Sequence, residues 1–123
     1  MPPIIPDIGT IIWANKPCKD DPRRWKDHPM VVMIPAKSDD PAETMRVIVC
    51  SGSEYVDKAD AGILCRLGFG PNKVLTKPTW AICDWPETVR MDELLLSRKH
   101  QVITGKELDT IKKIIAKLVP KTP

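Results

Sequence analysis

The chain has 123 residues, of which 42% are apolar and 28% charged, and its formal net charge is +3. This length suits a single domain over residues 1–123, and the composition is that of an ordinary soluble globular protein. No apolar run approaches the roughly 20 residues that cross a bilayer, which argues against a membrane-spanning protein. The net charge is too small to establish a nucleic-acid partner, so the distribution of the charges matters more than their sum.

The cysteines give no sign of a metal site. Cys18, Cys50, Cys65 and Cys83 are widely spaced, with no C-x-x-C pair, and the chain has only two histidines. We therefore expect no structural zinc, no other metal and no cofactor. Residues 1–7 lack both a basic start and a long apolar core, which predicts no signal peptide and a cytoplasmic location.

Short apolar runs bounded by proline or glycine predict many short strands. In chain order we expect strands at 9–15, 29–35, 45–50, 79–83 and 88–94, and shorter ones at 63–67, 73–76 and 101–104. Residues 54–77 show the weakest pattern.

One helix is predicted, at about 105–119. Thr104 and Glu107 have the spacing of a capping box, in which each side chain accepts a hydrogen bond from the other residue's backbone N–H. Apolar residues then recur at helical spacing on one face, and Pro120 ends the helix. One amphipathic helix beside many short strands predicts a mainly β fold, a compact barrel with a C-terminal helix.

A charged segment, residues 16–28, separates the first two expected strands, and we expect it to form a long loop. Long ordered loops often carry function. This one holds Arg23, Arg24, Trp25, Lys26 and His28. These residues offer cations for a phosphate, a flat ring for a base and an imidazole that can move protons. A solvated loop with the arginines paired to neighbouring aspartates explains them equally well.

Five segments, taken in order, are similar to those of a known family. They are Gly9–Trp13, His28–Ile34, Met45–Ser53, Thr79–Leu94 and Val102–Leu118. The first resembles a glycine-led opening strand, the second an Arg-Pro-Val-Leu-Val strand, and the third a strand that ends in a hydroxyl pair. The fourth resembles the late strands, and the fifth a closing Gly-x-Leu and amphipathic helix. In this order the chain resembles the MazF/PemK/Kid family of toxin ribonucleases.

The resemblance implies an SH3-like barrel, usually a homodimer, that cuts single-stranded RNA without a metal ion and is neutralised by an antitoxin protein. In that family an arginine before the proline and a threonine after the third strand do the chemistry. The matching positions here are His28, and Ser51 or Ser53. Arg24 or Arg23 lies near enough in sequence to supply the missing guanidinium. The expected catalytic residues are therefore His28, Arg24, Ser51 and Ser53.

The chemistry of such a reaction suits these residue types. Metal-free cleavage uses the RNA's own 2′-hydroxyl as nucleophile and needs a base, an acid and a cation. Histidine serves as base or acid near neutrality, and arginine presents a planar fork to phosphate. A serine hydroxyl can donate to a non-bridging oxygen, although a plain turn also explains residues 51–53.

The expected RNA-binding residues are Arg23, Trp25, Lys26, Trp85 and Arg90. Stacking on an aromatic ring contributes roughly 1–3 kcal/mol per base. Structural roles stay open for several of them: Trp25 could cap the barrel end, Trp85 could form a dimer contact, and Arg90 could pair with a nearby acid. Trp13 and Trp80 lie inside expected strands, so we expect them in the core.

Two functions of other classes fit the same sequence. One is a non-catalytic barrel that binds nucleic acid through residues 16–28. The other is a protein-binding barrel, similar in fold to the gyrase poison CcdB, that acts on a partner through its dimer surface.

Overall fold

The protein is described by a computed structural model, which covers residues 5–18, 21–52, 61–71, 73–95 and 101–118. The elements in chain order are β1 (Thr10–Pro17), β2 (Trp25–Ile34), β3 (Thr44–Ser51), the 3₁₀ turn η1 (Ala61–Ile63), β4 (Leu64–Leu67), β5 (Thr79–Arg90), the 3₁₀ turn η2 (Met91–Glu93), β6 (Gln101–Val102) and α2 (Gly105–Leu118).

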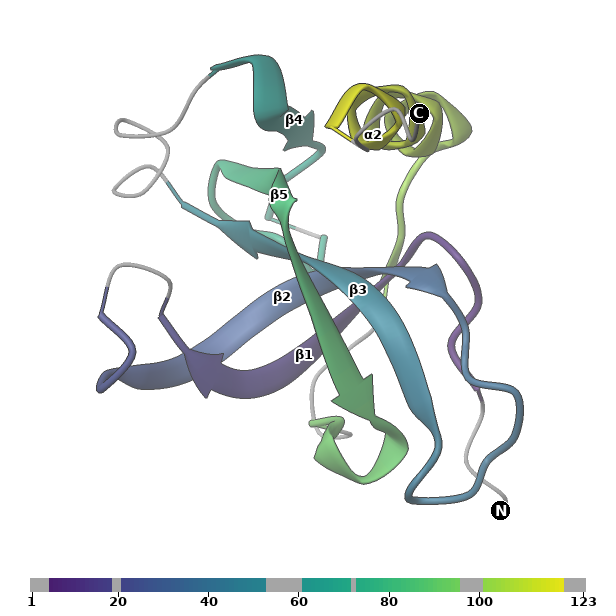
Figure 1. The fold of residues 1–123 in the computed structure, drawn as a ribbon. Coiled ribbons are helices and arrows are strands. Elements are labelled where there is room, and N and C mark those ends of the chain that lie inside the picture. Colours follow the sequence, from purple (N-terminus) through teal and green to yellow (C-terminus); the bar gives the residue numbers. More distant parts are fainter. Residues whose placement is uncertain (1–4, 19–20, 53–60, 72, 96–100, 119–123) are drawn as a thin grey trace.

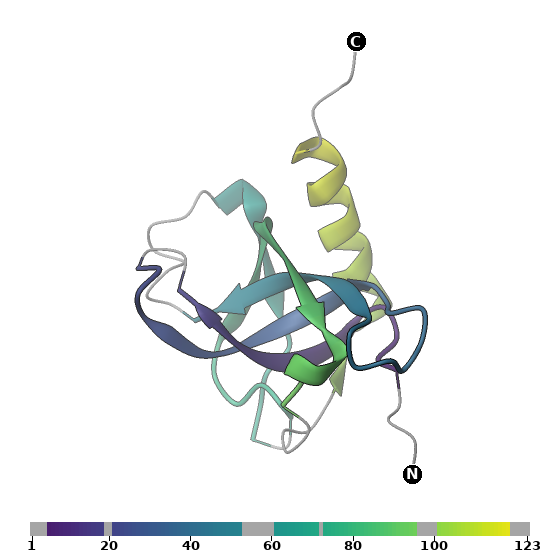
Figure 2. The same cartoon turned by 60° about the horizontal axis from the view of Figure 1, so that its bottom comes forward.

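The strands form one six-stranded sheet in the order β4-β5-β3-β2-β1-β6, and every neighbouring pair is antiparallel. The sheet curls into a half-barrel in which β5 crosses over β3 (Figure 1). Helix α2 stands along one side of this barrel (Figure 2). The prediction of a mainly β, small SH3-like barrel with a C-terminal helix is confirmed.

Alternation along the strands sorts the buried apolar side chains onto the two faces of the sheet. One face holds a group that we name the barrel cluster: Ile12, Ala14, Met30, Val32, Ala36, Met45, Val47, Val49, Ile82, Trp85, Val89, Met91 and Leu94. The other holds the helix-side cluster: Ile11, Val31, Ile48, Cys50, Cys65, Leu67, Leu75, Ala81, Cys83, Ile103 and Ile111. Ile111 comes from α2 and is fully buried, so the helix covers the second face.

The first two strands are longer than the sequence pattern indicated. The prediction of a loop over residues 16–28 is wrong at both ends of that range, because Lys16 pairs with Lys26 and Pro17 with Trp25 in a regular antiparallel ladder. The backbone N–H of Cys18 then donates to the Arg24 carbonyl at 2.8 Å. We call this end of the β1–β2 hairpin the arm. Its backbone groups are hydrogen-bonded between the two strands, so its charged side chains can stay in water.

A single bent strand replaces two expected ones. Strands were expected at 79–83 and 88–94, whereas β5 runs unbroken from Thr79 to Arg90 and is followed by η2. Pro86 does not interrupt it, because pairing with β4 covers only residues 79–82 and a shift in register with β3 lies beside the proline. A proline is tolerated where one side of a strand is open or bulged.

Helix α2 forms as predicted within the described residues. The Thr104 N–H donates to Glu107 Oε1 at 2.8 Å, and the Glu107 N–H donates to Thr104 Oγ1 at 3.1 Å, which completes the capping box. The other oxygen of Glu107 accepts from the Gly68 N–H at 2.7 Å, joining the helix start to the end of β4. In the described part of the chain, no helix has the length and apolar character that a bilayer crossing requires.

Candidate functional site

A pocket opens where β2 and β3 separate. The two strands pair from Ile34 opposite Arg46 as far as Met30 opposite Val49. Beyond that point β2 continues beside β1, whereas the end of β3 pairs with β5 (Figure 1). The residues on both sides of this separation line a pocket of about 390 Å³.

The wall of the pocket combines positive charge with hydroxyl groups. Its polar residues are Lys26, Asp27, His28, Ser51, Thr76, Lys77 and Thr79, and its larger apolar ones include Trp13, Pro29, Cys50 and Leu75. The Asp27 carboxylate is engaged, since its Oδ1 accepts a hydrogen bond from Asn15 Nδ2 at 2.9 Å. Lysines and hydroxyls around one cavity suit a phosphate-bearing ligand, because both donate to its oxygens.

Residues 74–79 form one side of the pocket. They are irregular up to Pro78, and β5 begins at Thr79. The Val74 N–H donates to Gln101 Oε1 at 2.9 Å, and Thr79 Oγ1 donates to the Lys77 carbonyl at 3.0 Å. The strand expected at 73–76 does not form. Side-chain hydrogen bonds hold this segment in place instead, and they keep Thr76 and Lys77 at the pocket.

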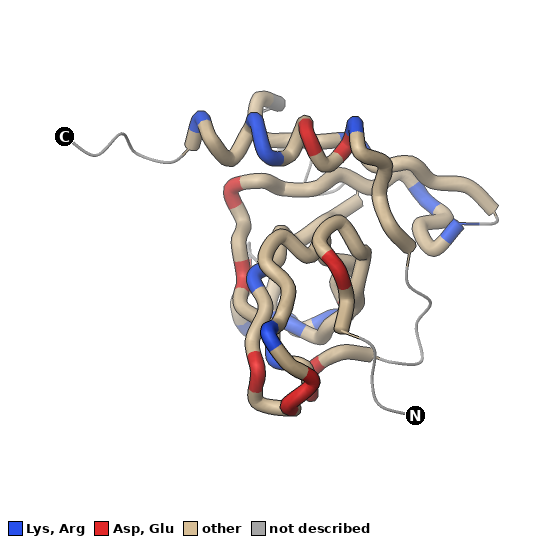
Figure 3. Tube along the Cα trace, turned by 90° about the vertical axis from the view of Figure 1, so that its right-hand side faces the viewer, with Lys and Arg blue, Asp and Glu red and all other residues tan. Residues whose placement is uncertain are grey.

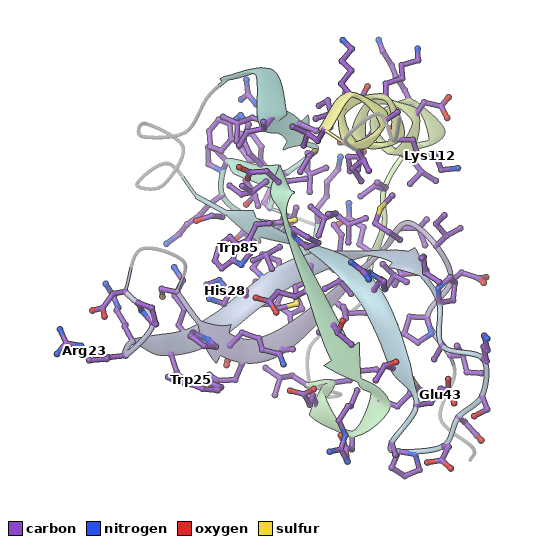
Figure 4. All side chains as sticks on the ribbon, viewed as in Figure 1. Arg23, Trp25, His28, Glu43, Trp85 and Lys112 are labelled. Carbon is purple, nitrogen blue, oxygen red and sulfur yellow. The ribbon has the colours of Figure 1, made fainter. Side chains whose placement is uncertain are left out.

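His28 is the most enclosed polar residue at the pocket. It is 1% exposed, and it shares the face of β2 that carries Met30 of the barrel cluster. Its ring meets that of Trp85 edge to face, with centroids 5.4 Å apart (Figure 4). Neither ring nitrogen meets the full geometry of a hydrogen bond among the described residues. The Lys16 carbonyl still acts on the ring as a weak acceptor, so at least one buried nitrogen is left without a partner.

The surroundings of His28 favour the neutral imidazole. Burial, followed by the positive charge of Lys26, lowers the pKa of His28 below its ordinary value of 6.5. The Lys16 carbonyl and the carboxylates of Asp27 and Glu87 act in the opposite direction and offset only part of this lowering. At neutral pH the ring is therefore uncharged and able to accept a proton.

Ser51 lies on the same face of the sheet as His28. Along β3 it follows Val49 by two residues, and Val49 is opposite Met30, which follows His28 by two on β2. Period-two alternation thus places both side chains on the barrel side of the sheet. Both residues also line the pocket, whose wall includes Trp13, Cys50 and Leu75 from the helix side. Ser53, the other expected hydroxyl, lies outside the described residues.

The two arginines expected at the site are at the end of the hairpin arm. Arg23 points away from the molecule (Figure 4), is almost fully exposed, and lies 3.8 Å from Asp21. Arg24 is exposed, and its backbone carbonyl accepts the hydrogen bond from the Cys18 N–H. Trp25 is 59% exposed on the same arm. None of these residues lines the pocket, whereas Lys26, two residues before His28, does.

Trp85 and Arg90 lie on β5 and do not line the pocket. Trp85 is 8% exposed within the barrel cluster, and its Nε1 donates to Glu87 at 3.3 Å. It is a core residue rather than a surface platform. Arg90 donates to Asp92 at 2.6 Å at the far end of the strand, which is the ion pair named as its structural alternative.

Several pocket residues, among them Lys77 and Asp27, were not site candidates in the sequence analysis. Lys77 and Asp27 carried no recognisable motif, and Lys77 falls in the least readable segment. Trp13 lies against the helix-side cluster, as expected, and also lines the pocket. Trp80, also expected in the core, is half-buried and belongs to neither cluster.

The described residues contain no group of three or more histidine, cysteine, aspartate or glutamate side chains placed to hold a metal ion. No protein-family model matches the sequence, and no curated protein matches it. The resemblance to the toxin ribonucleases stays a prediction.

Proposed function

We propose that this protein is a metal-independent endoribonuclease of the toxin kind, which cuts single-stranded RNA at the pocket between β2 and β3. The observation that carries the proposal is the neutral, buried imidazole of His28. At least one of its ring nitrogens lacks a hydrogen-bond partner among the described residues, and the residue lines a pocket together with Ser51 and two lysines, Lys26 and Lys77. A buried titratable group with a perturbed pKa beside such groups is typical of a functional site.

The proposed reaction is an internal transesterification. The 2′-oxygen of one nucleotide attacks the adjacent phosphorus, the bond to the 5′-oxygen breaks, and the products are a 2′,3′-cyclic phosphate and a free 5′-hydroxyl. His28 accepts the 2′-hydroxyl proton, and a lysine ammonium, Lys26 or Lys77, supplies a proton to the leaving oxygen. Ser51 donates to a non-bridging oxygen, where negative charge develops.

The enclosure of His28 sets a condition on this mechanism. A ring that is 1% exposed cannot touch a substrate until the wall of the pocket shifts. Catalytic hydrogen bonds commonly tighten only in the complex with substrate. The proposal therefore includes a movement of the pocket wall when RNA binds, and it extends to a cytoplasmic homodimer whose activity an antitoxin protein blocks.

The same enclosure favours a second candidate, a barrel that binds single-stranded nucleic acid without cutting it. No arginine is among the described residues that line the pocket. Arg23 and Arg24 lie on the exposed arm instead. In this candidate the lysines bind phosphate and His28 is a structural partner of Trp85.

The experiment is incubation of the purified protein with a long unstructured RNA in EDTA, followed by analysis of the fragment ends. We expect discrete fragments with cyclic-phosphate ends. His28→Gln should slow cutting by about 10²-fold or more, since a placed base contributes roughly 10²–10⁴-fold. Ser51→Ala should slow it by about 10²-fold, since one donor at a developing oxyanion contributes roughly 10²–10³-fold.

Lys112→Gln is the control for these variants, because Lys112 is exposed on α2, away from the pocket (Figure 4). Circular dichroism establishes that each variant folds. Binding without fragments would favour the second candidate, and neither binding nor cutting would exclude both and favour a protein-binding barrel.

A further inference from the structure

An aromatic pair with an arginine over it occupies the β4–β5 edge of the sheet. The Arg66 guanidinium carbon lies 5.6 Å from the centroid of the Phe69 ring and 5.9 Å from that of Trp80. Arg66 is exposed, and both rings are half-buried, so each keeps surface in water. These distances are within the range of cation–π attraction.

The core does not account for the position of Trp80. Trp13 and Trp85 both take part in the apolar clusters, whereas Trp80 is in neither. An exposed cation–π contact is worth only about 0.5–1 kcal/mol, which does not by itself explain why part of a large ring stays in water. The ring of Trp80 is therefore available to a ligand.

The strand register puts this group next to the pocket. Ser51 on β3 is opposite Trp80 on β5, and Trp80 is opposite Arg66 on β4. Directly opposed residues share a face and have Cβ atoms about 4.5–5.5 Å apart. Ser51 lines the pocket, and so does Thr79, the neighbour of Trp80 in the chain. A strand of nucleic acid leaving the pocket over Ser51 would thus meet Trp80 first and Arg66 next.

We propose that Trp80 and Arg66 form a stacking subsite for the nucleotide next to the one bound in the pocket. The base stacks on Trp80, and the guanidinium of Arg66 binds the following phosphate. Single-strand binders combine positive charge along the backbone with aromatic rings in this way, and stacking accepts every base. This inference rests on the proposed function, because it requires that the pocket binds RNA.

The test is a binding titration with single-stranded, fully 2′-O-methylated RNA, which lacks the free hydroxyl needed for cutting. Trp80→Leu keeps apolar volume but removes the ring, and we expect it to weaken binding by about 5- to 150-fold. Trp80→Phe should bind the RNA with an affinity closer to that of the unaltered protein. Arg66→Gln should weaken binding and lower the slope of log K against log salt by about 0.7.

Arg46→Gln is the matched control, because Arg46 is also an exposed arginine on a strand, paired with Thr88 at the other end of β3. If the unaltered protein binds and cuts RNA but Trp80→Leu and Arg66→Gln bind as tightly as it does, the subsite is wrong and the proposed function stands. If the unaltered protein binds no RNA, both fall. Should Trp80→Leu fail to fold, the test is the quenching of tryptophan fluorescence by RNA. If RNA stacks on Trp80, Trp80→Phe must show less quenching than the unaltered protein.

Discussion

At the scale of residues, His28 carries a cost that the fold does not offset. A polar ring buried without hydrogen bonds destabilises a folded protein by roughly 1–3 kcal/mol for each group left without a partner. Its edge-to-face contact with Trp85 returns part of this. Such unpaired polar atoms are expected where a ligand or a water completes them, which is why His28 is the centre of the proposed site.

The first prediction concerns the titration of this ring. Burial lowers the pKa of His28 in the folded protein below 6.5, so the imidazole signal in an NMR titration should change at a pH below that value. The unfolded chain then binds more protons than the folded one just below pH 6.5. The free energy of unfolding should therefore fall as the pH drops through 6.5 toward the folded pKa, and level off below it.

Urea unfolding between pH 5 and pH 7.5 measures this dependence, and His28→Gln should lose the part of the slope that belongs to His28. A His28 signal that titrates at or above 6.5 would contradict both the burial and the neutral base.

The burial of His28 could have been predicted from the sequence. His28, Met30 and Val32 recur at a spacing of two, which puts the histidine on the buried face once the strand is taken to begin at Trp25. The charges at Lys26 and Asp27 hid this pattern. Ser51 could be predicted from its position after a strand, but Lys77 could not, because only the folded chain brings residues 74–79 to that strand end.

At the scale of elements, α2 could be predicted almost to the residue because its signals are local. The capping box lies within four residues, and the apolar stripe depends only on spacing. The β1–β2 arm and the continuous β5 depend on which strands pair, and pairing is set by contacts distant in the chain. Pro86 is read as a break in sequence, yet it is accommodated by the missing neighbour on one side of β5.

The second prediction separates the two roles of Glu107, capping α2 and binding the Gly68 N–H beside β4. Thr104→Ala removes one cap hydrogen bond and should lower the free energy of unfolding by about 1 kcal/mol. Glu107→Ala removes the acceptor for both the Thr104 and the Gly68 N–H groups, at 2.8 Å and 2.7 Å, and should cost more, about 1.5–3 kcal/mol. Urea denaturation measures both, with exposed Lys112→Ala expected to stay within about 0.5 kcal/mol. Equal losses in the two variants would mean that the tie to β4 carries no stability.

At the scale of the whole molecule, the modest net charge of +3 is spread over separate regions. Along α2 the acids Glu107 and Asp109 lie near the start and are followed by lysines, whereas acids prevail at the opposite end of the molecule (Figure 3). Lys106, Lys112, Lys113 and Lys117 are all exposed on α2, so charge alone makes the helix a competing surface for RNA. Lys26 and Lys77 differ from them because they meet at one concave site.

The last prediction uses salt to decide between these two surfaces. Each phosphate contact in a single strand contributes about 0.7 to the slope of log K against log salt, through released counterions. Lys77→Gln should therefore lower the slope by about 0.7 and weaken binding at every salt concentration. Lys112→Gln removes the same charge from the molecule but should leave the slope unchanged, because Lys112 is exposed on α2, which contributes no residue to the described lining of the pocket. A loss of slope in Lys112→Gln as large as in Lys77→Gln would mean that RNA is attracted by diffuse charge. The pocket would then not be the binding site.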